Sequence, residues 1–496
     1  MPSIRKTKTA SGSTAVQVVR YENRKVVVLK HIGSGKSDEE VSALIESARV
    51  WVEKHTRQVS LFPTQEQRTL PIATTKYLGV THVFARETLH KLASLCGFDA
   101  QQDTLLLDLA IMRILEPTSK LRSIELMKRY FEIRYAQRTV YRALPRLIER
   151  KKVMEDVAIA CAKKNLQSDL ALVLYDVTTL YFETFTSDGL RKQGFSKDNK
   201  SQQPQIVIGL LATREGFPLG YEVFAGNTFE GHTMMPVLEA FAQTHSVKTP
   251  TVVADAAMLS HANIEELKKR NLSYIVGARL ANASPAVIDK VSEVMAQEDG
   301  TTVRVPTQHG DLIASFSQKR YRKHKGDMER QLERGKKLIQ KNEPGRRAKF
   351  VTKEGGDAYV LNEALIEKTK RLLGIRGYYT NIPEKQLSNE EVISRYHDLW
   401  HVESAFRMAK SDLASRPIFH YTEDAVRAHI LICFVALVIG RYAELRAGVS
   451  ARTLRDLLWS VTDATMMDTA TGETFSFRSP VSEDVEMFLQ KLDASY

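Results

Sequence analysis

Between Asp169 and Leu280 the chain alternates short apolar runs with helical segments, and this alternation limits the possible folds more than any other feature. A buried strand has a continuous apolar run, whereas a helix places apolar residues every three or four positions. The expected strands are 171–175, 205–213, 221–224, 251–254 and 273–276, and the expected helices begin at Thr233 and His261. Strands that alternate with helices build a sheet covered by helices. The sequence therefore predicts a mixed α/β fold.

Three acidic residues stand out against this pattern. Asp176 follows the strand run 171–175, Asp255 follows the run 251–254, and Glu403 lies in the helical segment 396–410. Carboxylates are ligands for hard divalent cations, and three of them can hold two ions while leaving positions for water and phosphate oxygens. If the fold brings the three together, they form a metal site that cuts phosphodiesters.

The segment around Glu403 has the spacing of an amphipathic helix. Its apolar residues fall within an arc of roughly 80° at 100° per residue: Leu399, Val402, Phe406, Ala409 and Leu413. Tyr396, Glu403 and Lys410 form a second line at intervals of seven, beside that stripe. There a carboxylate can reach a metal while packing holds its backbone. The alternative is a surface Glu403 that pairs with Arg407 at i, i+4, which stabilises a helix by only tenths of a kcal/mol.

Size and charge favour a globular protein with a polyanionic partner. The chain has 496 residues, 43% of them hydrophobic, and a net charge of +12, which favours nucleic acid or an anionic membrane surface. The longest apolar run, 430–439, is too short to span a bilayer, so we expect a buried helix and no membrane partner. Cys96, Cys161 and Cys433 lie far apart and indicate neither a disulfide framework nor a zinc cluster. With no signal peptide pattern at the start, we expect a reducing cytoplasm.

Positive charge gathers in residues 319–353, named here the basic stretch. It holds 14 Lys or Arg against four acids, a net charge of +10. One interpretation is a solvated basic helix and loop. The other is a surface that neutralises DNA phosphates, with Lys319, Arg320 and Arg322 as candidate contacts. Because the stretch lies between Asp255 and Glu403 in the sequence, we expect it to extend from the edge of the catalytic sheet.

A second basic region covers residues 120–152, with 11 Lys or Arg against three Glu. A helix, a short polar turn near 135–137 and a second helix with Arg138 and Arg142 resemble a helix-turn-helix, which lays its second helix in the major groove of DNA. An ordinary helical hairpin with basic outer faces is the alternative. Pro145 also opposes a long recognition helix.

The Glu403 helix matches a known signature. Tyr396, Glu403 and Lys410 fit the pattern Tyr, two residues, Arg, three residues, Glu, six residues, Lys of bacterial transposases of the insertion-sequence-four class. Other motifs follow in the order of the sixteen-thirty-four subgroup: Ile-Arg-Lys-Thr-Lys at 4–8, Lys-His-Ile-Gly-Ser at 30–34, Tyr-Asp-Val-Thr-Thr at 175–179, Gly-Phe-Ser-Lys-Asp at 194–198, Gly-Asn-Thr at 226–228 and Val-Ala-Asp-Ala at 253–256. The resemblance spans nearly the whole chain. One position departs, since Leu399 stands where the signature has Arg.

The resemblance implies a ribonuclease-H-like catalytic core with an insertion before its last helix. Asp176, Asp255 and Glu403 would be the DDE triad that holds two Mg²⁺ ions, which Mn²⁺ can replace, for cleavage and strand transfer. It also implies double-stranded DNA as partner, both as terminal inverted repeats and as target, and a homodimer that holds two ends in a bacterial, nucleoid-associated setting. Lys192 and Lys197, in the loop after the first strand, would contact this DNA together with Tyr396, Arg407 and Lys410. Leu399 leaves open whether cleavage passes through a DNA hairpin.

The expected organisation has six parts. They are a β-hairpin and helix (1–60), a helical, helix-turn-helix-like DNA-binding region (61–165), the first part of the core (166–282), a basic insertion domain (283–375), the second part of the core with the Glu403 helix (376–445), and a C-terminal helical tail (446–496). Two rival functions remain open. One is a ribonuclease-H-like nuclease without strand transfer, and the other is a non-catalytic DNA-binding protein derived from a transposase.

Overall fold

The computed structural model describes residues 2–22, 25–55, 74–98, 103–245, 250–258, 260–341, 348–354 and 358–492. The chain forms two compact units. The first comprises residues 1–87, 126–134 and 456–486, and the second comprises 88–125, 135–455 and 487–496. The domain boundary expected at residues 60–61 and residues 342–347 of the basic stretch lie outside the described ranges.

The first unit contains two small antiparallel sheets. One is the meander β1 (Pro2–Lys8), β2 (Thr14–Glu22) and β3 (Lys25–Gly35), which packs on α1 (Asp38–His55) through Val16, Val18 and Leu44. The predicted N-terminal hairpin and helix are therefore present, with β1 as an added strand. The other sheet joins β4 (Thr75–Thr81), β15 (Asp463–Asp468) and β16 (Thr474–Arg478).

The prediction of a wholly helical C-terminal tail was wrong. Helices α15 (Ala451–Ser460) and α16 (Glu483–Lys491) flank the β15–β16 hairpin. The turn of this hairpin uses Gly472 at φ +72°, a left-handed conformation that glycine adopts without a steric cost. Strand β15 also pairs with β4, almost 400 positions earlier in the chain, so its pairing partner is invisible to any local pattern.

The second unit is built on a mixed sheet with the strand order β10-β11-β14-β9-β8-β5-β6-β7. Its strands are β5 (Leu172–Tyr181), β6 (Gln205–Ala212), β7 (Pro218–Ala225), β8 (Thr251–Ala254), β9 (Tyr274–Ala278), β10 (Thr302–Thr307), β11 (Gly310–Phe316) and β14 (Ile375–Thr380). β5, β6 and β7 are antiparallel, whereas β8 runs parallel to both β5 and β9. Three antiparallel strands followed by two parallel ones, in the order β7-β6-β5-β8-β9, form a ribonuclease-H-like core, as expected.

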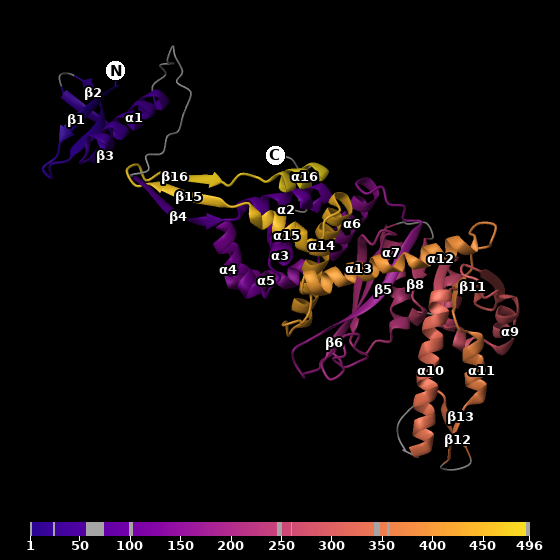
Figure 1. Ribbon diagram of the computed structural model, residues 1–496. Coiled ribbons are helices and arrows are strands. Elements are labelled where there is room, and N and C mark those ends of the chain that lie inside the picture. The colour runs from indigo at the N-terminus through magenta and orange to yellow at the C-terminus, as the bar shows by residue number, and fades with distance from the viewer. Residues whose placement is uncertain are drawn as a thin grey trace. The chain divides into compact units, whose positions relative to one another are not determined.

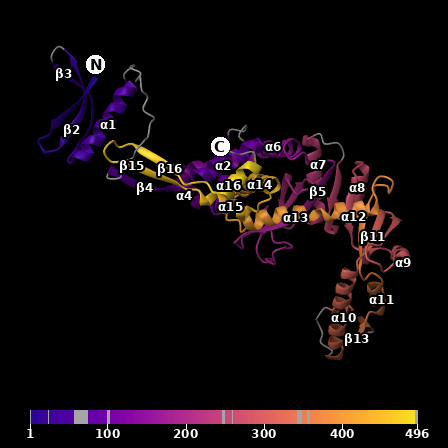
Figure 2. The same cartoon turned by 45° about the horizontal axis from the view of Figure 1, so that its top comes forward.

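The insertion does not form a wholly separate domain. Its strands β10 and β11 join the main sheet through β14 and extend it beyond β9. The remainder comprises α9 (Pro285–Val294), α10 (Gln318–Lys341), the hairpin β12 (Val351–Glu354) and β13 (Ala358–Leu361), and α11 (Glu363–Arg371). α10, α11 and the hairpin lie side by side (Figures 1 and 2) and share a small core of Met328, Phe350 and Ile366.

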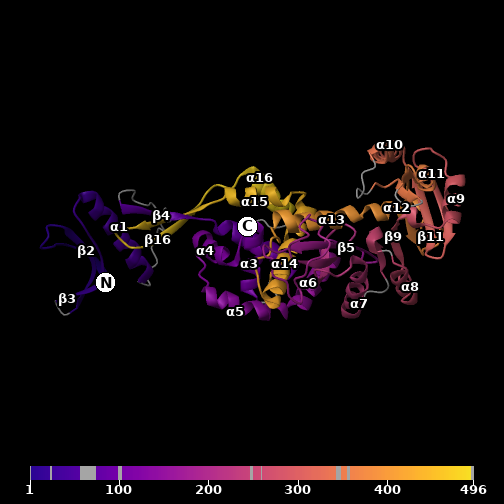
Figure 3. The same ribbon diagram turned by 90° about the horizontal axis from the view of Figure 1, so that it is seen from below.

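Helices cover both faces of the main sheet. α7 (Met234–His245) and α8 (His261–Lys269) lie on one face, and α12 (Asn389–His397) and α13 (Leu399–Arg407) on the other (Figure 3). α12 and α13 follow each other almost in line (Figures 1 and 2), so the amphipathic helix predicted around Glu403 is present in two pieces. They are followed by a π-helical turn, Met408–Asp412.

The remaining helices are α2 (Val83–Cys96), α3 (Thr104–Leu115), α4 (Lys120–Phe131), α5 (Gln137–Ile148), α6 (Lys151–Lys164) and α14 (Glu423–Ala447). α14 is long and apolar enough to cross a membrane, but 89% of its most apolar window is buried within the protein, which confirms the predicted buried helix. The three cysteines are buried and free. α4 and α5 occupy the predicted helix-turn-helix positions, and α5 continues through Pro145. Because the two units divide α4 at Leu126, the helix-turn-helix geometry stays a prediction.

Candidate active site

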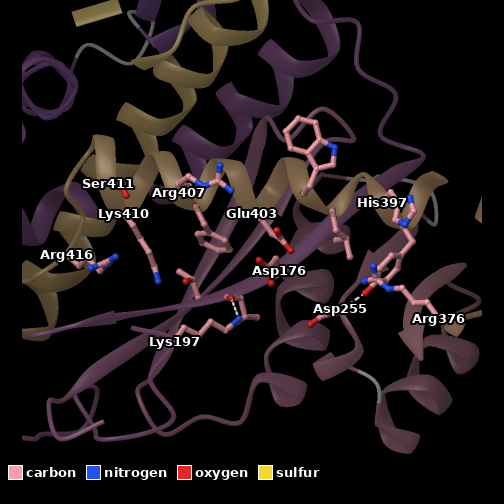
Figure 4. A pocket seen from close by; sticks show the side chains of 16 residues that line it. Asp176, Lys197, Asp255, Arg376, His397, Glu403, Arg407, Lys410, Ser411 and Arg416 are labelled. Atoms are coloured by element: carbon pink, nitrogen blue, oxygen red, sulfur yellow. Dashed lines mark hydrogen bonds between the residues drawn. The ribbon is translucent and has the colours of Figure 1, made fainter. Parts of the chain in front are cut away.

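Asp176, Asp255 and Glu403 line one cavity of about 770 Å³ (Figure 4). Asp176 lies within β5 and Asp255 directly follows β8. The parallel register pairs Tyr175 with Ala254, so the two aspartates occupy the next matching positions on adjacent strands. Glu403 approaches from α13, which packs against β5. The sequence pattern indicated that the strand ends just before Asp176. That was wrong, because the polar residues Thr178 and Thr179 continue the pairing of β5 with β6.

Asp176 sits in a low-dielectric environment. Its neighbour Tyr175 points to the opposite face and donates a hydrogen bond to Thr233 Oγ1 at 2.7 Å, as the alternation of a strand requires. Burial raises the pKa of Asp176 to about 6, and the nearby charges of Glu403 and Asp255 act in the same direction. Lys197 opposes the rise. The Lys197 ammonium donates to the Val177 carbonyl at 2.5 Å, which holds this cation beside Asp176.

Asp255 is held by Tyr396. The phenol of Tyr396 donates to Asp255 Oδ1 at 2.9 Å, and the Arg376 guanidinium lies over the Tyr396 ring at 5.0 Å. Burial raises the pKa of Tyr396, as does the Asp255 charge, so the phenol remains protonated and can donate. A Cβ atom at Gly277 on β9 would lie 2.5 Å from the Tyr396 hydroxyl oxygen, so this glycine makes room for the phenol.

Glu403 is an exposed residue on the cavity wall, and its carboxylate points toward that of Asp176 (Figure 4). Glu403 and Arg407 are both described in the structure, and they form no ion pair with each other. The alternative of a surface Glu403 paired with Arg407 is therefore not supported. Among all the residues that the structure describes, no three His, Cys, Asp or Glu side chains gather closely enough to form a complete metal-ligand cluster. The three carboxylates are spread around the cavity wall, and that of Asp255 accepts a hydrogen bond from Tyr396.

Cations surround the three acids. Lys197, Arg376, Arg407, Lys410 and Arg416 all line the cavity. Lys410 and Arg416 both pair with Asp198 Oδ2 at 3.3 Å, so a single carboxylate from the β5–β6 connection fixes two cations. Burial lowers the pKa of Lys410, whereas the Asp198 charge opposes this shift. The predicted site residues Lys197, Tyr396, Arg407 and Lys410 are therefore brought together with the triad.

The start of α10 brings part of the basic stretch near this cavity. His397 lines the cavity, and its pKa is lowered mainly by burial and then by the charges of Arg376 and Arg320. Arg320 is half-buried, and its Nη1 atom, among the described polar groups, has no hydrogen-bond partner. Lys319 and Arg322 are exposed on the same helix. Of the three predicted contacts on α10, Arg320 is thus the one whose charge contributes to the lowered pKa of His397.

Like the three residues on α10, three further predicted DNA contacts do not line the cavity. Lys192 forms a backbone bridge with Gln205 at the base of the β5–β6 connection, and its side chain is not part of the lining. Arg138 and Arg142 are exposed on α5. These residues stay predictions.

The sequence patterns missed Arg376, Trp400 and Arg416. Arg376 is the one exposed residue of β14. A lone charged residue in an otherwise apolar strand was the feature of the sequence that could have identified it. Trp400 is 58% exposed, lines the cavity and contacts the His401 ring. At 100° per residue, Trp400 lies about 140° from the centre of the apolar stripe of this helix, so its side chain points away from the core. Leu399 is buried, as the helical spacing predicted.

Comparison with known proteins agrees with this site. Residues 167–439, more than half of the chain, match the family model of the transposase DDE domain. A solved structure of piggyBac transposase in a synaptic complex with hairpin DNA is 10% identical, with 85% of this chain and 77% of that chain covered and a TM-score of 0.36. A Mos1 transposase paired-end complex with the left transposon end is 13% identical, with 46% and 71% covered and a TM-score of 0.16. Both structural likenesses are weak, and no curated protein matches the chain. The family match spans every strand of the main sheet and all three acids of the cavity, and the chain belongs to the transposase DDE domain family.

Proposed function

We propose that this chain is a DNA transposase that binds the terminal inverted repeats of its insertion sequence, cleaves them and transfers the 3′ ends to target DNA. One observation carries the proposal: the acids on β5, after β8 and on α13 line one cavity together with five cations. The cations suit the phosphates of a DNA strand, and the carboxylates suit divalent metal ions. The insertion-sequence-four class and its sixteen-thirty-four subgroup are part of the proposal, supported by Tyr396, Glu403 and Lys410 at the signature spacing.

The donor set fits divalent ions such as Mg²⁺ or Mn²⁺. Three carboxylates supply the hard oxygen ligands that these ions take, and Asp176, which is desolvated and lies near the charges of Glu403 and Asp255, gains from a nearby cation. Asp176, Asp255 and Glu403 are the proposed ligands. Such ions, when bound, supply Lewis acidity toward the scissile phosphate and activate water or a DNA 3′-hydroxyl.

The chain's own residues then have distinct tasks. Tyr396 orients Asp255 through its hydrogen bond. Lys197 holds positive charge beside Asp176, where the scissile phosphate is expected. Lys410 and Arg416, fixed by Asp198, offer two cations to the same strand. Synapsis of two ends requires two active sites, so we also propose a homodimer on DNA, acting in the bacterial cytoplasm.

The test uses three isosteric variants: Asp176→Asn, Asp255→Asn and Glu403→Gln. Each should lower Mg²⁺-dependent cleavage of a labelled terminal-repeat duplex by at least about 10²-fold, because each removes a charged ligand. Glu239→Gln is the charge-matched control, since Glu239 pairs with Arg270 and does not line the cavity. Cleavage by the triad variants at the wild-type rate would overturn the proposal.

Two further measurements separate the rival functions. A labelled duplex with pre-cut 3′ ends should yield joined products on a target plasmid, and a structure-specific nuclease would yield none. A non-catalytic DNA-binding protein would show no metal-dependent nicking at all. Denaturing gels of the cleavage products also distinguish hairpins, nicks and double-strand breaks.

A further inference from the structure

The second unit has another cavity, of about 600 Å³, which we name the Lys120 pocket. Its wall is formed by Arg113 of α3, residues 117–120 at the start of α4, one residue of α5, the connection 414–422 and the first two turns of α14. Three basic residues of this wall are almost completely buried: Arg113, Lys120 and His429 are 6%, 3% and 4% exposed. Among the described residues that line the pocket, none is Asp or Glu.

The contacts of these basic groups are neutral. Lys120 Nζ lies 3.0 Å from His429 Nδ1, and His429 Nε2 lies 3.1 Å from the Ser415 carbonyl oxygen. Because a carbonyl only accepts, Nε2 carries the proton, and Nδ1 accepts from Lys120. Arg113 has only a long contact of 3.5 Å to the Ala414 carbonyl among its described hydrogen bonds. Buried cations are normally paired with an anion, so this wall is short of negative charge.

The mouth of the pocket is aromatic. Phe419 and Tyr421 line it and are 63% and 76% exposed. Exposed rings of this size remain uncovered in water only at a hydrophobic cost. Flat rings beside a cationic wall suit a ligand with one flat apolar face and one anionic group. A nucleotide has both, because its base stacks on aromatic rings and its phosphate takes charge-assisted hydrogen bonds.

The Lys120 pocket and the catalytic cavity share one wall residue. Arg416 lines both. A DNA strand whose phosphate lies by the three acids can therefore pass Arg416 and place a neighbouring nucleotide in the pocket. A strand bound in this way is unpaired at that nucleotide, since a base that stacks on protein rings has left its own duplex.

We propose that the Lys120 pocket binds one unpaired nucleotide of the DNA strand that the catalytic cavity engages, with its phosphate on Arg113 and Lys120 and its base against Phe419 and Tyr421. The proposal rests on the proposed DNA function but concerns a separate site. The volume fits, because ligand pockets of about 300–1,000 Å³ hold molecules of this size.

Photocrosslinking tests the site directly. The full chain is irradiated with a single-stranded oligonucleotide that carries 5-iododeoxyuridine, and the crosslinked peptides are mapped by mass spectrometry. Crosslinks to Phe419 or Tyr421 are expected. Crosslinks found only elsewhere, for example at Trp400, would overturn the proposal.

Competition distinguishes the sources of the phosphate. The unlabelled oligonucleotide should displace the crosslink at the lowest concentration, thymidine 5′-monophosphate at a higher one, and thymidine or inorganic phosphate only weakly. Inorganic phosphate as effective as thymidine 5′-monophosphate would make this a simple anion site. Thymidine 5′-monophosphate as effective as the oligonucleotide would make it a site for free nucleotides. Either result overturns the proposal.

Variants complete the test. Phe419→Ala should weaken single-strand binding about tenfold, in line with the loss of one stacked base, whereas Phe185→Ala, at a ring that is also exposed but lies outside the pocket, should not. Glu403→Gln should keep the crosslink. If the wild-type protein cleaves no terminal-repeat DNA but still crosslinks at Phe419 or Tyr421, only the catalytic proposal falls. If cleavage depends on Glu403 while Phe419→Ala binds and crosslinks like the wild type, only the pocket proposal falls.

Discussion

Tyr396 donates its phenolic hydrogen to Asp255 at 2.9 Å, and this bond joins the first residue of the signature to the second acid of the triad. The ring is held independently by Tyr378, at 4.8 Å between centroids, and by Arg376 above it. The side chain is therefore fixed by packing, and its hydroxyl is free to orient Asp255.

Replacing Tyr396 with Phe should keep the fold and lower cleavage by about 10- to 100-fold, the usual effect of losing a partner that orients a metal ligand. The divalent ion concentration for half-maximal rate should rise as well, since Asp255 loses its fixed orientation. A metal titration of the cleavage rate measures both effects. Tyr379→Phe, at a buried tyrosine that contacts His309, is the control. A drop in rate with no change in metal dependence would contradict a positioning role.

Replacing Gly277 with Ala tests the same relationship from the sheet. The added Cβ would lie 2.5 Å from the Tyr396 hydroxyl oxygen, so the phenol must move away from Asp255. We expect a cleavage defect like that of Tyr396→Phe, with a destabilisation of about 1–3 kcal/mol from overpacking. Gly189→Ala is the matched control, because nothing lies within 4 Å of its added Cβ. If Gly277→Ala cleaves DNA at the wild-type rate, moving the Tyr396 phenol away from Asp255 does not impair cleavage, and the prediction fails.

Much of the main sheet was predictable because its strands are buried on both faces. The apolar runs before Asp176 and Asp255 are short and rich in valine and leucine, which favours buried strands over helices, and parallel pairing then aligns the two acids. Glu403 was found by a seven-residue spacing that persists through the break between α12 and α13. The spacing of apolar residues was sufficient to predict an element wherever that element is buried.

The missed features depend on pairing partners far away in sequence. Asp198 gains its role only when the connection at 414–422 brings Arg416 to it. The strand β10 was assigned to a separate domain because nothing in residues 302–307 encodes its alignment with the core through β11 and β14. Arg113 and Lys120 are ordinary helix cations in the sequence, and they are buried where α14 packs against α3 and where His429 of α14 contacts Lys120.

Removing Asp198 should strengthen DNA binding. Asp198 neutralises Lys410 and Arg416, so Asp198→Asn releases two cations toward the cavity. We expect higher affinity for non-specific duplex and a plot of log K against log salt that is steeper by about 1–2. Glu239→Gln adds the same net charge outside the cavity, where Arg270 keeps Glu266 as a second partner, and it should change the slope less. Equal salt slopes for the two variants would mean that the net charge of the protein, and not the position of the freed cations, determines DNA affinity.

Arg320 and Arg322 should behave differently although they are two residues apart. Arg322 is exposed, so Arg322→Gln should weaken binding and reduce the salt slope by about 1, while DNA that is already bound is cleaved normally. Arg320 acts on His397 at the cavity, so Arg320→Gln should lower the cleavage rate at saturating DNA by about tenfold. Single-turnover cleavage and anisotropy titrations separate the effects. Identical profiles would place both residues on one outer binding face.

Lys120 should make the stability of the DNA-free protein depend on pH. Burial lowers the pKa of Lys120 to about 7, with Arg113 acting in the same direction and Cys433 opposing it. Between this value and the ordinary pKa of about 10.4, the unfolded chain binds the proton and the folded chain does not, so stability rises with pH. The gain should approach 2 kcal/mol between pH 7 and pH 8.5, and it should vanish below pH 7, where both states are protonated. Subtracting the unfolding free energy of Lys120→Met at each pH removes the contributions of other groups. A difference that stays constant from pH 7 to pH 9 would show that Lys120 is charged throughout, and the wall of the Lys120 pocket would then hold a permanent buried cation.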